Sequence, residues 1–248
     1  IAVPPEPQGG SVTIDGDTYT AVGGGMNLSY DEETGIPTLT AGKAQLSEAA
    51  KLKVITGSVA DAEDPDYTYE ESLIIENTGG QPVSVDKNGS IKVPSNGSIS
   101  IENTQMDTNG NETVTTKDIS VPGDSGEITI TPDGDSLDIS LPGVRNTVEI
   151  DGVDYTTTKD ATKLKTDKNG TSLVAGGVSL DGGATPKESI IVNNTEITNY
   201  GDSNSNINVS VNGTNTDFTV SPGGSFGMSV PGDADSEVLF TNPSREDE

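Results

Sequence analysis

The chain has 248 residues, and its 40 acidic and 13 basic residues give a formal net charge of −27. The electrostatic field of so negative a chain repels nucleic acid and anionic lipid, so we expect no nucleic-acid partner. Cysteine, histidine and tryptophan are absent, which excludes disulfides, Ser-His-Asp and Cys-His catalysis and histidine-bound zinc. A carboxylate pair for glycoside hydrolysis is the main catalytic alternative, but six Tyr and three Phe provide few aromatic platforms. We therefore predict that the chain is not an enzyme.

The acidic excess has three explanations: a well-solvated surface, a habitat of high salt, or bound cations. No stretch reaches the roughly 18 apolar residues that span a bilayer, so we expect no transmembrane segment.

The Pro-rich N-terminal segment, residues 1–10, reads "IAVPPEPQGG" and begins at Ile1 rather than at Met. Removal of a leader would give such a start, and so would a further segment of the chain before Ile1. We expect a secreted protein that is extracellular or held at the cell surface.

Several passages recur in the same order along the chain. "VTIDGDTYT" at 12–20 corresponds to "VEIDGVDYT" at 148–156, and "ESLIIENT" at 71–78 corresponds to "ESIIVNNT" at 188–195. "TPDGDSLDISLPG" at 131–143 likewise corresponds to "SPGGSFGMSVPG" at 221–232. The order predicts an internal repeat with two domains, 11–143 and a shorter 144–232, followed by an acidic C-terminal tail, 233–248.

Composition alone can generate such matches in a chain rich in Gly, Ser and Thr. "DKNG" shows the risk, because it occurs at 86–89 and 167–170 but out of order with the other passages. Shared turn chemistry explains that match without duplication, since Asn-Gly pairs supply the positive φ of tight hairpins.

Alternating apolar and polar residues predict strands in most of the chain. In "EITITPDGDSLDISLPG" the apolar residues alternate with Thr, Asp and Ser on both sides of a Pro-Asp-Gly turn, which predicts a hairpin with one face in the core. The expected core residues are Ile128, Ile130, Leu137, Ile139 and Leu141. Turn residues at regular spacing are typical of sandwiches and small barrels. We predict an all-β fold of two tandem, related β-sandwich domains, jelly-roll or Ig-like.

One short helix is expected in the first domain, at "GKAQLSEAAKLKV" (42–54), where Leu46, Ala49, Ala50 and Val54 lie roughly on one helical face. The acidic "DAEDPD" (61–66) that follows should be an exposed loop.

Calcium is the cofactor that the residue types suit best, because it takes six to eight oxygen ligands. Asp and Asn recur at every second position in "DTNGN" and "DSNSN", which gives the metal candidates Asp107, Asn109, Asn111, Asp202, Asn204 and Asn206. Neither run has the glycine or the distal Glu of an EF-hand, and turn formation explains the same spacing.

Eight Asn-x-Ser/Thr sequons suggest glycan attachment in a surface protein. They begin at Asn27, Asn88, Asn96, Asn111, Asn169, Asn193, Asn208 and Asn212.

"SLIIENTGGQPVSV" is followed by a strand-turn-strand pattern that ends in "VPG", and a helix is expected between early strands. This combination resembles the camelysin-type jelly-roll subunits of bacterial biofilm-matrix fibres and of archaeal bundling pili. The resemblance covers about 40 residues. It implies a secreted subunit that polymerises by donor-strand exchange, with Ile1, Ala2 and Val3, or Val12 to Ile14, as the donor. Two departures are the three prolines of "IAVPPEP", which cannot donate to a β-ladder, and the duplication.

Together these features favour a non-catalytic structural subunit of an extracellular assembly, a filament, pilus-like fibre or surface coat. Subunits would associate with one another by β-strand augmentation into a homopolymer or lattice. Two alternatives remain open: a decoration or fibre protein of a virion, and a cell-surface adhesin that binds a ligand through loops such as 61–66.

Overall fold

The computed structural model describes residues 9–23 and 25–180 and, beyond them, 189–191, 195–199, 205–211, 214–221, 225–228 and 238–241. All regular structure in these residues is β, as the sequence predicts, and none of them is helical. The described part of the chain accordingly contains no helix that is long and apolar enough to cross a membrane.

Nine strands form one sheet of the sandwich. In spatial order they are β1 (Ser11–Ile14), β2 (Asp17–Ala21), β5 (Lys43–Leu46), β8 (Val83–Asp86), β9 (Ile91–Val93), β12 (Ile128–Asp133), β13 (Ser136–Leu141), β16 (Thr162–Asp167) and β17 (Gly170–Ala175).

Eleven strands form the facing sheet. In spatial order they are β23 (Ser225–Met228), β20 (Thr195–Asn199), β18 (Gly177–Leu180), β15 (Val153–Thr157), β14 (Thr147–Ile150), β11 (Glu112–Ser120), β10 (Ser98–Met106), β7 (Thr68–Asn77), β6 (Lys51–Ala60), β4 (Pro37–Ala41) and β3 (Asn27–Tyr30). A four-stranded sheet follows the order β19 (Ser189–Ile191), β24 (Val238–Thr241), β21 (Ser205–Val211), β22 (Thr214–Val220).

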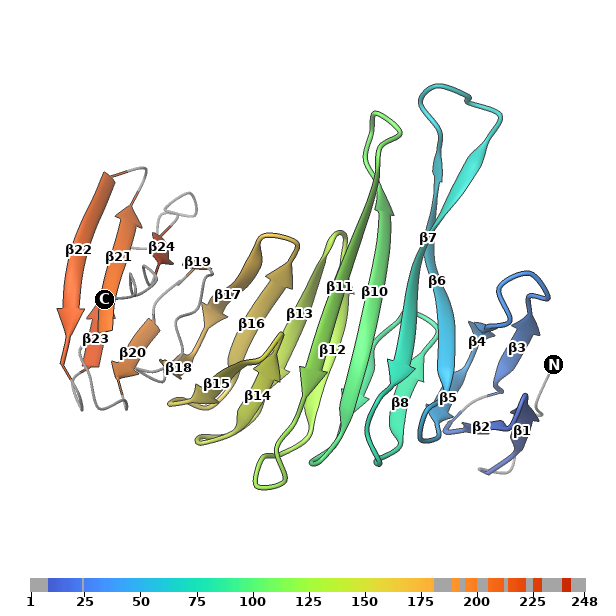
Figure 1. The fold of residues 1–248 in the computed structure, drawn as a ribbon, viewed down its shortest axis with the longest axis horizontal. Helices are drawn as coiled ribbons and strands as arrows, with labels where there is room; N and C mark the ends of the chain where they lie inside the picture. Colours follow the sequence, from blue (N-terminus) through green and yellow to red (C-terminus); the bar gives the residue numbers. More distant parts are fainter. Residues whose placement is uncertain are drawn as a thin grey trace.

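The chain builds the two large sheets together, by placing successive pairs of strands in alternate sheets. The hairpin β6–β7 lies in the eleven-stranded sheet, β8–β9 in the nine-stranded sheet, β10–β11 in the former, and β12–β13 in the latter. The same alternation continues through β14–β15 and β16–β17. Both sheets therefore grow in the same direction along the longest axis of the molecule (Figure 1).

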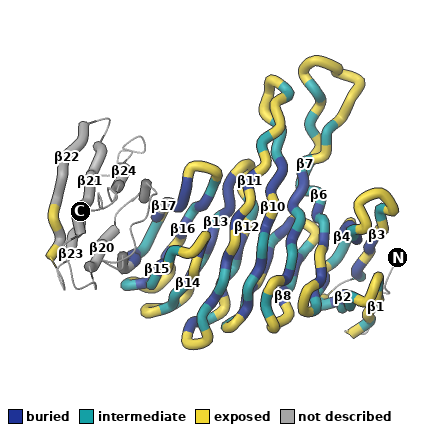
Figure 2. Tube along the Cα trace, in the orientation of Figure 1, coloured by how far each residue is buried: buried dark blue, intermediate teal, exposed yellow. Residues whose placement is uncertain are grey.

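A single core lies between the two sheets. Strands of the eleven-stranded sheet contribute Leu52, Leu73 and Ile101, and strands of the nine-stranded sheet contribute Ile130 and Ile139, all fully buried. The five core residues predicted from the hairpin pattern at 127–143 are all buried, which confirms that prediction. Figure 2 shows this interior in dark blue along the middle of the central strands.

Asp-Gly pairs form the two-residue turns of the β1–β2 and β14–β15 hairpins. Asp15 and Gly16 both have positive φ, 52° and 96°, and Asp151 and Gly152 repeat this with 51° and 80°. Two successive residues with positive φ define the turn that matches the right-handed twist of the flanking strands. The two similar passages at 12–20 and 148–156 therefore form hairpins with the same type of turn.

The prediction of a helix at 42–54 is wrong. Residues 43–46 form β5, and residues 51–60 form β6. A turn lies between the two strands, and in it Ala49 has a φ of 67°. The buried side chains follow a period of two, Ala44 and Leu46 in β5 and then Leu52 and Val54 in β6. In so short a stretch a period of two and a period of 3.6 select overlapping residues, and contact with the two sheets decides between them.

The sheets continue across the expected domain boundary at residues 143 and 144. Strand β11 pairs with β14 through Ile119 and Ile150, and β13 pairs with β16 along five residues, Leu137 to Leu141. The two Asp-Gly hairpins also lie in different sheets, β1–β2 in the nine-stranded and β14–β15 in the eleven-stranded sheet. Neither sheet is interrupted where the repeats predict the division.

Candidate functional site at the first end of the sandwich

Both large sheets end in a strand at the same end of the molecule, β1 in one sheet and β3 in the other (Figure 1). Among the described residues, β1 pairs only with β2, and β3 pairs only with β4. Each outer strand therefore has one side without a β-partner in this part of the chain, and such a side is a template for another strand.

The pairing of β1 fixes which of its backbone groups face outward. The amide of Ala21 donates to the carbonyl of Gly10 at 2.8 Å, and Val12 pairs with Tyr19. Because bonded residues alternate along an antiparallel strand, Val12 and Ile14 face β2, while the N–H and C=O groups of Ser11 and Thr13 point away from it.

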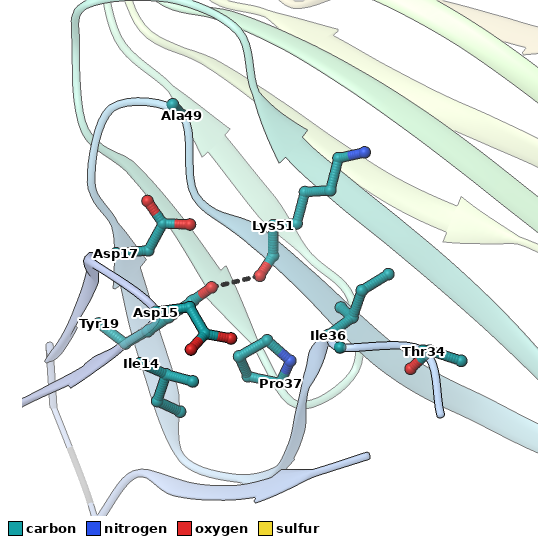
Figure 3. Close-up of a pocket in the computed structure, with 10 residues that line it drawn as sticks. Ile14, Asp15, Asp17, Tyr19, Thr34, Ile36, Pro37, Ala49 and Lys51 are labelled. Carbon is teal, nitrogen blue, oxygen red and sulfur yellow. Dashed lines mark hydrogen bonds between the residues drawn. The ribbon is translucent and has the colours of Figure 1, made fainter. Parts of the chain in front are cut away.

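A pocket of about 300 Å³ lies beside this edge, between the β1–β2 turn, the β3–β4 loop and the β5–β6 turn (Figure 3). Apolar side chains and carboxylates share its lining. The residues are Ile14, Asp15, Asp17, Tyr19, Thr34, Gly35, Ile36, Pro37, Ala49 and Lys51.

Tyr19 closes the inner side of the pocket. Its ring is almost fully buried, and its hydroxyl donates a 2.5 Å hydrogen bond to the carbonyl of Lys51. Burial, together with the negative charge of Asp17, raises the pKa of Tyr19 far above its ordinary value. Tyr19 therefore stays neutral and acts as a hydrogen-bond donor that joins β2 to β6 across the two sheets.

Tyr30 forms a second link between the sheets, through the lining residue Asp15. Its hydroxyl donates to a carboxylate oxygen of Asp15 at 3.0 Å, which connects the end of β3 to the β1–β2 turn. That hydrogen bond and the charge of Asp15 raise the pKa of the exposed Tyr30.

Asp17 occupies a position at which this hairpin otherwise places apolar side chains. It pairs with Ile14 and therefore shares the inner face with Ile14 and Tyr19. Its carboxylate makes no hydrogen bond or ion pair with a described residue, and its charge acts on Tyr19. Sequence reasoning did not place Asp17 on the inner face, although the Asp-Gly turn and the alternation after it would have assigned the residue to that face.

Two long hairpins form a second exposed feature. β6–β7 and β10–β11 extend past their neighbours, and Figure 2 shows their ends as exposed. The loop at 61–66 is mostly exposed, as predicted, and Tyr67 beside it is 54% exposed. The two tips approach each other, since a Cβ on Gly110 would lie 3.0 Å from Oδ1 of Asp61. A hydrogen bond between Tyr69 and Glu112 joins the two hairpins below their tips. Burial and this hydrogen bond raise the pKa of Tyr69 to about 12.

The metal candidates at 107–111 form a turn held by hydrogen bonds. Oδ1 of Asp107 accepts the amides of Asn109 at 2.8 Å and of Asn111 at 2.9 Å, and Oδ2 accepts the side-chain amide of Asn111 at 2.9 Å. These three bonds lower the pKa of Asp107.

The "DKNG" turns repeat this arrangement. Asp86 accepts the amide of Asn88 at 2.9 Å, and Asp167 accepts that of Asn169 at 2.7 Å. Shared Asp-x-Asn-Gly turn chemistry is thereby confirmed for all three loops.

The remaining metal candidates are less fully described. Asp202 and Asn204 lie outside the described residues, and Asn206 is described only as part of β21. In the described part of the chain no cluster of three or more Asp and Glu side chains is arranged to hold a metal ion.

Five of the eight sequon asparagines have exposed side chains, and all five lie in β3 or in loops: Asn27, Asn88, Asn96, Asn111 and Asn169. Asn208 is described only as part of β21, and Asn193 and Asn212 lie outside the described residues.

The assembly-strand candidates divide in the same way. Ile1, Ala2 and Val3 lie outside the described residues. Val12 and Ile14 belong to β1, where both pack against the core of their own chain.

Comparison with known proteins gives no match to a family model, to a curated protein or to a solved structure.

Proposed function

We propose that the protein is a non-catalytic structural subunit of an extracellular assembly, and that its subunits join by strand addition at the ends of the two large sheets. The observation that carries the proposal is the outer side of β1, where Ser11 and Thr13 offer backbone donors and acceptors without a described β-partner. Backbone groups on such an edge pair readily with an extended segment of another chain.

The direction of sheet growth supports a fibre. Strands of both sheets stack along the longest axis of the molecule (Figure 1), so a strand added beside β1 would continue the sheet along that axis. Repetition of one such contact between identical subunits generates a filament when the contact does not close into a ring.

The surface chemistry supports an extracellular location. The chain lacks cysteine, carries a net charge of −27, and exposes the side chains of five sequon asparagines. The residue types that supply most nucleophilic catalysis, Cys and His, are missing.

The test is to remove one outward backbone donor. Thr13→Pro deletes the amide that points away from β2, and edge strands tolerate proline on that side. Thr13→Ala keeps the amide and serves as the matched control. Negative-stain microscopy and light scattering, with calcium and with chelator, should show assemblies of the native protein and of Thr13→Ala, and monomers of Thr13→Pro. Assembly of Thr13→Pro to the same length, or a native protein that stays monomeric at every concentration, would refute the proposal.

A binding role has a separate observation in its favour, the two projecting hairpins with their exposed ends and the exposed Tyr67. Replacement of residues 61–66 by Asn-Gly would shorten one hairpin and leave the β1 edge unchanged. An adhesin would then lose adhesion to its target surface, whereas a structural subunit would assemble as before.

A further inference from the structure

The hairpin β1–β2 differs from its counterpart β14–β15 at one inner position. Aligning "VTIDGDTYT" with "VEIDGVDYT" places Asp17 opposite Val153, and Ile14 opposite Ile150. Val153 packs against the core, as an inner-face residue of such a hairpin should. Asp17 instead brings a carboxylate to the inner face, next to the buried ring of Tyr19. The same backbone position therefore accommodates an apolar side chain, and the charge at Asp17 is not required by the turn.

Among the described residues, the pocket around Asp17 has one cationic side chain, and that side chain is engaged elsewhere. Lys51 lines it, but the Lys51 ammonium pairs with Glu76 at 2.9 Å and points away from Asp15 and Asp17 in Figure 3. Asp15 accepts one hydrogen bond, from Tyr30, and Asp17 accepts none from a described residue. Two carboxylates thus line a cavity of about 300 Å³, and neither forms an ion pair with a cation in the described part of the chain.

The rest of the lining selects the kind of cation. Ile14, Ile36 and Pro37 give the pocket apolar walls, which suit an aliphatic chain. A calcium ion needs six to eight oxygen ligands, and the side chains of Ile14, Ile36 and Pro37 supply none. A primary ammonium group on an alkyl stem satisfies both parts of the pocket: the stem packs on the walls and the charge meets the carboxylates.

We propose that this pocket binds the alkylammonium group of a lysine side chain, and that the lysine belongs to a neighbouring subunit whose strand is added at the outer side of β1. The source of the lysine rests on the proposed function, whereas the ammonium site itself does not. Ile14, at the end of β1, lines the pocket, so an added strand lies beside it. Lysine is the cation in best supply, because only two of the 13 basic residues are arginine.

The ammonium site is tested on the monomer. Isotope-labelled Thr13→Pro protein is titrated with n-butylammonium, which reproduces the lysine side chain, and with n-butanol, which has the same stem without the charge. Saturable NMR shifts of Tyr19 and Ile36 are expected with butylammonium and absent with butanol.

Asp17→Asn should weaken butylammonium binding about tenfold, the effect of roughly 1.4 kcal/mol from one partly exposed charge. The control Asp124→Asn removes an exposed carboxylate that does not line the pocket and should leave the affinity unchanged. Equal binding by Asp17→Asn, or no saturable binding at all, would overturn the site.

The source of the lysine is tested in assemblies grown from a mixture of unlabelled and ¹⁵N-labelled native chains. A carbodiimide couples a carboxylate to an amine in contact with it, so mass spectrometry should find Asp15 or Asp17 joined to a lysine of the other isotope. Butylammonium binding by the monomer without such a cross-link in assemblies would assign the pocket to a free alkylamine and overturn the lysine source. Absence of any assembly would overturn the proposed function, and the monomer titration would still decide the ammonium site.

Discussion

The ammonium of Lys117 lies 2.7 Å from Oδ2 of Asp151, and the lysine side chain is only 7% exposed. Lys117 projects from β11 into the sandwich, and Asp151 lies in the β14–β15 turn. The other carboxylate oxygen of Asp151 accepts the amide of Asp118 at 3.0 Å, and the amide of Asp151 donates to the carbonyl of Asp118 at 2.8 Å. A buried charge, a charged partner and two backbone bonds thus fasten this turn to the end of β11.

Removal of the partner should cost more than removal of the buried charge. Asp151→Asn keeps a residue that tolerates positive φ, but it leaves the Lys117 ammonium buried beside a neutral amide, so we expect a loss of about 2 kcal/mol of unfolding free energy. Lys117→Met removes the charge and keeps the stem, and should cost less than about 1 kcal/mol. Urea unfolding of the two variants and of the double variant measures both values. If Lys117→Met lost more unfolding free energy than Asp151→Asn, the attraction within the ion pair would outweigh the cost of leaving one buried charge unpaired.

Gly89 should be far less replaceable than Gly134, although both lie in turns of the nine-stranded sheet with positive φ, 79° and 59°. A Cβ on Gly89 would lie 2.6 Å from Cδ1 of Leu73, a fully buried residue of the facing sheet, whereas nothing lies within 4 Å of one on Gly134. Gly134→Ala should lose only the free energy of placing an alanine at positive φ, about 1 kcal/mol. Gly89→Ala adds displacement of the core, and we expect a total of about 2–4 kcal/mol. Equal losses in thermal or urea unfolding would contradict the close packing of this turn.

Asn111→Ala should raise the pKa of Asp107 toward its ordinary value. The side-chain amide of Asn111 is the largest cause of the lowered pKa, while the backbone amides of Asn109 and Asn111 remain in the variant. Because a lowered pKa in the folded state stabilises the protein above the unfolded pKa, this contribution is lost as pH falls through the folded value. Carboxyl ¹³C titration by NMR measures the shift, with Asn88→Ala as a control that should leave Asp107 unchanged. Calcium added to the same titration tests the metal assignment, since a bound cation would lower the pKa further.

Ala49→Gly should stabilise the protein. Ala49 has a φ of 67° in the exposed turn between β5 and β6, a conformation that costs an alanine about 1 kcal/mol and a glycine very little. The greater freedom of glycine in the unfolded chain offsets part of this gain, so the expected increase is about 0.5 kcal/mol. Ala50→Gly, at the neighbouring buried position, should destabilise instead. A loss of stability in Ala49→Gly would mean that its methyl group makes contacts that outweigh the strain.

The sequence by itself determined the local units of this protein. Asp15-Gly16 and Asp151-Gly152 fix two hairpins, because their turns need successive residues with positive φ. Alternation then assigns residues such as Ile130 and Ile139 to the inner face. Part of the site follows the same pattern, because the register places Asp17 beside Tyr19 once the turn is known. To identify the outward backbone groups of Ser11 and Thr13, the pairing of β1 must be known as well.

Only the tertiary structure decided how the hairpins combine. A hairpin carries the same apolar face whichever sheet it joins, so the local pattern gives no sign that β1–β2 and β14–β15 lie in opposite sheets. It likewise cannot show that β13 pairs with β16 across residue 143, or that 42–54 is strand, turn and strand. The pocket is decided in the same way, because Asp17, Ile36 and Lys51 come from three segments that meet only where the two sheets end. These features depend on contacts between residues far apart in the chain, and the free energy of such contacts is set by the shared core rather than by any one segment.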